Sequence, residues 1–140
     1  MGHVSTILGY VREPMLRGEP RMLVESHNRA KLFGLPKTDI WPPLSRTLFS
    51  TTLEQETYQD PLIYFAGTFN FGVDDWDEWI KKFEVLLKSL VWIEAKVFLE
   101  TDFENNHAYI WKASQNSIKE IFQDVPKPVS DWDFSKTRIP

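Results

Sequence analysis

Seven carboxylates form the pattern with the clearest potential for chemistry in this 140-residue chain. They are Asp74, Asp75, Asp77, Glu78, Glu100, Asp102 and Glu104. The predicted helix that starts near residue 75 runs about 24 Å to Leu90 at about 1.5 Å per residue. The predicted strand 93–101 returns about 28 Å in the opposite direction at about 3.3 Å per residue. The carboxylates are therefore expected at one end of the domain, where they predict an acidic partner-binding edge.

Two other interpretations of these carboxylates stay open. Acidic side chains are favoured at the positive end of a helix, and polar residues are favoured at hairpin turns, so local stability alone could account for them. A pair of carboxylates could instead act in acid–base catalysis or bind Mg²⁺, but such a site also needs a substrate pocket. We assign them to partner binding and assign no catalytic residue.

The other residue types that carry chemistry show no site pattern. His3, His27 and His107 lack the spacing of metal ligands. The chain has no cysteine, which excludes disulfides, thiolate metal sites and thiol nucleophiles. Its six glycines are scattered and no serine lies in a Gly-x-Ser-x-Gly elbow, so neither a phosphate-binding loop nor a serine hydrolase is predicted. We therefore expect no metal, no cofactor and no enzymatic activity.

The charge distribution narrows the choice of partners. The net charge is −4, and the acidic excess lies in the second half of the chain. No stripe of lysine and arginine is present that could neutralise phosphates, so nucleic acid is not expected to bind. The first twelve residues do not resemble a signal peptide, and no apolar stretch has the length of a membrane span. The sequence thus predicts a cytoplasmic protein without a membrane partner.

Periodicity and turn residues predict the elements that must position these groups. Strands are expected at 3–11, 48–53, 61–71, 93–101 and 107–112, and helices at 20–33, 75–90 and 117–123. The strand 61–71 has apolar residues on both faces, which favours a central place in the sheet.

The two longer helices are expected to present particular faces and caps. Apolar residues at spacings of three and four from Trp76 to Leu90 predict an amphipathic second helix, with Asp75 as its N-cap in a capping box with Glu78. For the first helix, the expected inward stripe is Leu23, His27, Ala30 and Phe33.

This element order predicts an α+β fold with a mostly antiparallel sheet. Two helices are expected to cover one face of the sheet, which has a ferredoxin-like core and one extra strand. Residues 1–123 are expected to form a single domain. Residues 124–140 are expected to form an irregular tail packed on or near that domain. Trp132 is expected to anchor this tail, with a binding hot spot as the alternative role.

Several aromatic segments carry a resemblance across residues 61–112. They are Tyr64-Phe65-Ala66-Gly67-Thr68-Phe69, Asp75-Trp76-Asp77-Glu78-Trp79, Trp92, Leu99-Glu100-Thr101 and Tyr109-Ile110-Trp111. With its size, aromatic richness and element order, the chain resembles small bacterial immunity proteins of polymorphic-toxin and contact-dependent inhibition systems. The resemblance implies a cytosolic, non-enzymatic protein that binds and neutralises a cognate toxin domain. It carries over no site residues, because such families share a fold while their binding surfaces differ.

Two alternatives to a toxin inhibitor stay open. The first is a small-molecule-binding or enzymatic α+β domain with a pocket between sheet and helices, lined by Tyr10, His27, Tyr64 or Trp111. The second is a homo-oligomeric structural module, such as a homodimer formed through an unpaired edge of the strand 107–112.

Overall fold

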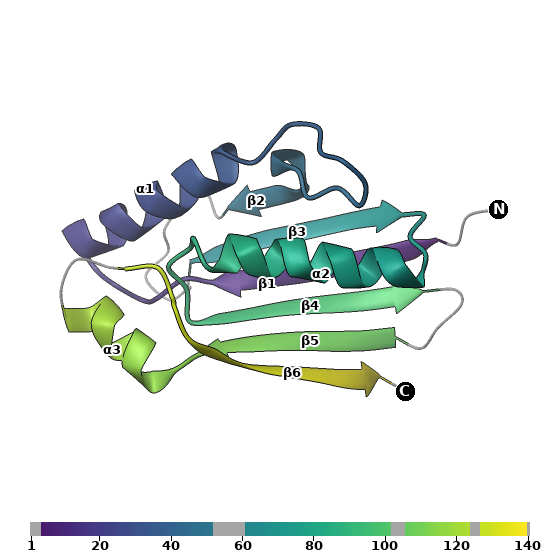
Figure 1. The fold of residues 1–140 in the computed structure, drawn as a ribbon. Helices are drawn as coiled ribbons and strands as arrows, with labels where there is room; N and C mark the ends of the chain where they lie inside the picture. The colour runs from purple at the N-terminus through teal and green to yellow at the C-terminus, as the bar shows by residue number, and fades with distance from the viewer. Residues whose placement is uncertain (1–3, 52–60, 102–105, 124–126, 140) are drawn as a thin grey trace.

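The fold combines one antiparallel sheet with three α-helices (Figure 1). The computed structural model describes residues 4–51, 61–101, 106–123 and 127–139. The helices are α1 (Glu19–Phe33), α2 (Val73–Leu87) and α3 (Gln115–Gln123), with a short 3₁₀ helix, η1, at Arg46–Leu48. The strands are β1 (Ser5–Arg12), β2 (Phe49–Thr51), β3 (Leu62–Phe69), β4 (Glu94–Thr101), β5 (Asn106–Ala113) and β6 (Trp132–Ile139). The predicted α+β class and antiparallel sheet are confirmed.

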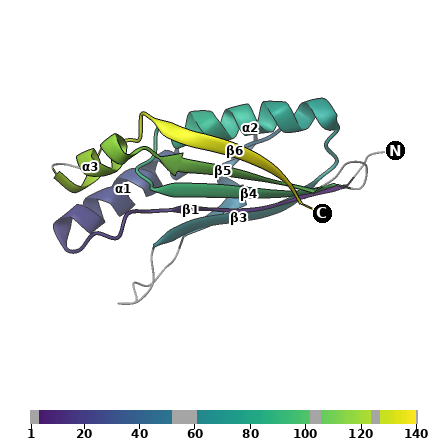
Figure 2. The same cartoon turned by 90° about the horizontal axis from the view of Figure 1, so that it is seen from below.

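The strand order β2-β3-β1-β4-β5-β6 places β1 in the middle of the sheet. Ser5 at the start of β1 pairs with Phe69 of β3 on one side and with Thr101 of β4 on the other. Paired residues on neighbouring strands share a face, and successive residues alternate between faces. The two faces of the sheet therefore carry different side chains, and only one of them is packed beneath α2 (Figure 2).

The core lies between α2 and that face of the sheet. Trp79 and Phe83 of α2 are fully buried and stacked, with ring centroids 5.4 Å apart. The Phe83 ring also meets Phe65 of β3 at 5.3 Å and Trp111 of β5 at 5.2 Å. The predicted amphipathic helix is thus confirmed, and its apolar stripe contacts strands on both sides of β1. Helices α1 and α3 lie toward the end of the sheet where α2 ends (Figure 1).

The N-terminus of α2 differs from the prediction in its cap. The helix begins at Val73, so Gly72 is the N-cap and Asp75 is the third helical residue. The Asp75 carboxylate accepts a hydrogen bond from the Gly72 backbone N–H at 2.8 Å. The expected N-cap role of Asp75 was wrong, because this carboxylate reaches back to the cap from inside the first turn, as the acidic member of a capping box does.

Helix α1 buries a different stripe from the predicted one. Its buried residues are Val24, Asn28 and Leu32, whereas Leu23 is 45% exposed and Phe33 is 71% exposed. The predicted stripe was wrong because the buried face of α1 includes a polar residue. Asn28 is buried because hydrogen bonds satisfy its amide, and hydrophobic periodicity cannot identify an inward polar residue.

The Asn28 amide joins three segments of the chain. Its Nδ2 donates to Glu13 Oε2 at 2.7 Å and to the Val91 carbonyl at 2.9 Å, and its Oδ1 accepts the Val91 N–H at 2.9 Å. Nearby, His27 Nε2 donates to the Ser89 carbonyl at 2.8 Å. These bonds fix α1 to the segment between α2 and β4.

The segment expected to be an irregular tail contains a sheet strand. β6 pairs with β5 from Asn106↔Ile139 to Ala113↔Trp132, so the sheet has one strand more than predicted and the edge of β5 is not free. Only Trp132 and Phe134 alternate with polar residues in β6, and the following residues 135–138 are polar and exposed on both faces of the sheet, so the alternation is too short to predict a strand. Trp132 lies 5.8 Å from Trp92 between ring centroids and packs on the core, which confirms its predicted anchoring role.

Candidate functional site

Four of the seven predicted acidic residues lie in the first turns of α2. Asp74, Asp77 and Glu78 are exposed, and Asp75 is half-buried by its bond to the cap. Glu78 forms an exposed ion pair with Lys81 at 3.5 Å. This acidic start lies at the same end of the domain as the end of β4, as the opposite directions of helix and strand predict (Figure 1).

The fifth acidic residue, Glu100, lies on the other side of the sheet. Its neighbours Leu99 and Thr101 are buried on the α2 side, so Glu100 projects from the opposite face. The last two, Asp102 and Glu104, lie outside the described residues. Glu100 therefore shares an end of the domain with the α2 acids but not a surface, and a binding role for this set stays a prediction.

We call the sheet face opposite α2 the open face. It carries a contiguous apolar strip. Leu8 of β1 is flanked by Ala66 of β3 and Phe98 of β4, and Tyr10 is flanked by Tyr64 of β3. Leu8 is 52% exposed and Tyr64 is 47% exposed. Figure 2 shows no helix of the described residues on this side. A sheet face that only meets water is normally polar, so this apolar strip requires an explanation.

Charged groups lie beside the strip. Arg12 Nη2 and Glu94 Oε2 form an ion pair at 3.3 Å, and the Tyr10 hydroxyl donates to the same carboxylate oxygen at 3.2 Å. Burial raises the pKa of Tyr10, and the Glu94 charge raises it further. The Lys96 ammonium lies 5.0 Å from the centre of the Phe98 ring. An apolar centre with a charged border is typical of protein contact surfaces.

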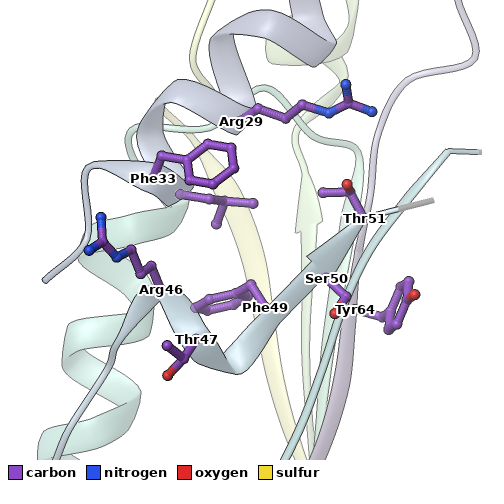
Figure 3. Close-up of a pocket in the computed structure, with 9 residues that line it drawn as sticks. Arg29, Phe33, Arg46, Thr47, Phe49, Ser50, Thr51 and Tyr64 are labelled. Atoms are coloured by element: carbon purple, nitrogen blue, oxygen red, sulfur yellow. The ribbon is translucent and has the colours of Figure 1, made fainter. Parts of the chain in front are cut away.

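A separate cavity of about 650 Å³ opens between α1 and β2 (Figure 3). Of the four pocket groups suggested from sequence, Tyr64 lines it, while Tyr10, His27 and Trp111 do not. The described residues that line it are Arg29, Leu32, Phe33, Arg46, Thr47, Phe49, Ser50, Thr51 and Tyr64. These residues come from α1, η1, β2 and β3, so no local pattern in the sequence could have identified the group.

The described residues lack two other kinds of feature. No group of three or more histidine, aspartate or glutamate side chains there could hold a metal ion. None of the helices there combines the length and apolar character needed to cross a membrane. In comparisons with known proteins, no family model, no curated protein and no solved structure matches this chain.

Proposed function

We propose that this chain is a non-enzymatic protein that binds a protein partner through its open face. The partner class is a bacterial toxin domain, as the resemblance to immunity proteins implies. The observation that carries the proposal is the strip formed by Tyr64, Leu8 and Phe98 on adjacent strands, with two of its members about half exposed. Tyrosine in such a strip supplies a large, rigid contact surface and is enriched among residues that dominate binding energy.

The open face is also large enough to provide much of an interface. Strands lie about 4.8 Å apart and rise about 3.3 Å per residue, so four eight-residue strands cover about 19 by 26 Å, or about 500 Å². A stable protein complex buries about 800 Å² on each partner. The face of β3, β1, β4 and β5 would therefore supply more than half of one side of an ordinary interface.

The strand order supports a more specific description of the fold. β2, β3, β1 and β4 are adjacent and antiparallel, and the chain passes through them with α1 after β1 and α2 after β3. We interpret these four strands and two helices as a ferredoxin-like core, with β5, α3 and β6 as an addition at one edge. As an immunity protein, the chain would act in the cytoplasm of the cell that produces the toxin.

The proposed function predicts that a gene adjacent to this one encodes a toxin domain, and it is tested by co-expressing this chain with that domain. We expect the chain to restore growth of bacteria that express that domain and to bind it in a purified system. Failure of both protection and binding would refute the proposed partner class.

The surface is tested by arginine substitutions on opposite sides of the molecule. Leu8→Arg and Tyr64→Arg place a charge on the open face, whereas Val85→Arg places one on α2 at a side chain that is 67% exposed. We expect the first two variants to weaken toxin binding at least about tenfold, which corresponds to about 1.4 kcal/mol, and Val85→Arg to bind normally. Circular dichroism must show that all three fold.

Substitutions of the acidic residues at the start of α2 test the alternative interface. If Asp74→Lys, Asp77→Lys and Glu78→Lys together abolish binding while Leu8→Arg and Tyr64→Arg leave it unchanged, the interface lies at the start of α2. That result would refute the open face as the interface and would support the acidic edge predicted from the sequence.

A further inference from the structure

The cavity between α1 and β2, which we call the α1–β2 pocket, has apolar walls. Phe33 lines it from α1 and Phe49 lines it from β2 (Figure 3). Leu32 of α1 is a further lining residue and is buried, whereas Phe33 is 71% exposed. Removing that apolar surface from water would favour any ligand with an apolar body.

Two arginine side chains, from α1 and η1, also line the pocket. Figure 3 shows Arg29 and Arg46 on opposite sides of Phe33. Both are exposed, and neither forms an ion pair or hydrogen bond with a described residue. Elsewhere in the described chain, Arg12 and Arg21 are paired with carboxylates. The pocket therefore combines apolar walls with two exposed arginines that form no close ion pair with a described residue. Of the two, Arg29 also interacts through its charge with the buried Glu13 carboxyl.

We infer that the α1–β2 pocket binds a small organic anion, in which one carboxylate or sulfonate is joined to an aromatic or aliphatic body. The apolar body would cover Phe33 and Phe49, and the guanidinium of Arg29 or Arg46 would donate hydrogen bonds to the anionic group. The volume of about 650 Å³ lies within the range of small-molecule sites. This site is distinct from the protein-binding role proposed for the open face.

The inference is tested with a matched pair of probes, 2-naphthoate and its uncharged counterpart 2-naphthamide, with decanoate as an aliphatic anion. Binding to the full chain is measured by calorimetry, and amide chemical-shift changes locate the site. We expect saturable binding of naphthoate at one site, with shifts centred on Leu32 and Phe49. Naphthamide should bind at least about tenfold more weakly, which corresponds to a loss of about 1.4 kcal/mol of binding free energy.

Variants separate the pocket from non-specific attraction to a positive surface. Arg29→Gln, Arg46→Gln and Phe33→Ala change exposed side chains, so the fold should be unaffected. Arg138→Gln is the matched control, because Arg138 is exposed on β6 and does not line the pocket. We expect Phe33→Ala and at least one pocket arginine variant to weaken naphthoate binding at least about fivefold, and the control to change it less than about twofold.

Three results would overturn the inference. The first is equal affinity for naphthoate and naphthamide, which would leave no role for the charge. The second is unchanged naphthoate affinity in both pocket arginine variants. The third is the absence of saturable binding by both naphthoate and decanoate at concentrations up to about 1 mM. Tyr64 is left unchanged in these pocket variants because it also belongs to the open face, so their outcome does not affect the test of the protein-binding proposal.

Discussion

Replacing Asn28 with alanine should be far more damaging than replacing Phe33, although hydrophobicity suggests the reverse. Asn28→Ala removes three hydrogen bonds, one to the buried Glu13 carboxyl and two to the backbone of Val91. A neutral buried hydrogen bond contributes about 1 kcal/mol and one to a charged group contributes about 1.5–3 kcal/mol. We therefore expect the free energy of unfolding to fall by about 3–5 kcal/mol, a large part of the stability of a domain this size.

Phe33→Ala is the matched control on the same helix. Its side chain is 71% exposed, so its truncation should change the free energy of unfolding by less than about 0.5 kcal/mol. Urea unfolding followed by tryptophan fluorescence measures both values. The reasoning would be refuted if Phe33→Ala cost as much as Asn28→Ala, or if Asn28→Ala cost less than about 1 kcal/mol.

Three further perturbations test the core, the buried carboxyl and the edge strand. Trp79→Ala should cost about 3–5 kcal/mol because it empties the fully buried space beside Phe83, and a thermal melt that falls by only a few degrees would argue against that packing. Burial raises the pKa of the Glu13 carboxyl in the folded state above its unfolded value near 4.5. The protonated carboxyl therefore makes its full contribution to stability below the unfolded pKa, and this contribution is lost as pH rises through the folded pKa. Glu13→Gln, whose amide oxygen can still accept from Asn28, should therefore be more stable than the parent at pH 7, and urea unfolding from pH 4 to 8 should show that this advantage disappears in acid. Deleting residues 131–140 removes β6 and exposes the edge of β5, so the shortened chain should self-associate in size-exclusion chromatography, whereas a monomer at every concentration would contradict this.

Hydrophobic periodicity in the sequence predicted the helices and strands that have one buried face and one exposed face. α2 alternates between core and water with the helical period, and β4 alternates between a buried and a partly exposed face. Both were predicted because burial imposes its period on the sequence. β6 was missed because most of its side chains remain exposed whichever face they occupy.

The candidate surfaces were harder to predict for two physical reasons. In β3, apolar residues on both faces predicted a central place in the sheet, and β3 does lie between β2 and β1, but Tyr64 on one of those faces is 47% exposed. The sequence records that a side chain is apolar and does not record what covers it. The α1–β2 pocket combines residues of α1, such as Arg29, with residues of β2, such as Phe49, through tertiary packing, so its residues share no local spacing.

The central place of β1 also affects the route by which the chain folds. Ser5 has its two sheet partners at Phe69 and Thr101, so both sides of β1 require large loops to close before any ladder forms. β4 and β5, in contrast, are neighbours in both sequence and space. Sheets rich in distant pairings fold in roughly milliseconds to seconds. In pulsed hydrogen exchange during refolding, we expect amides of β4 and β5 to gain protection first, with β1 entering late as the strand that joins the two halves of the sheet.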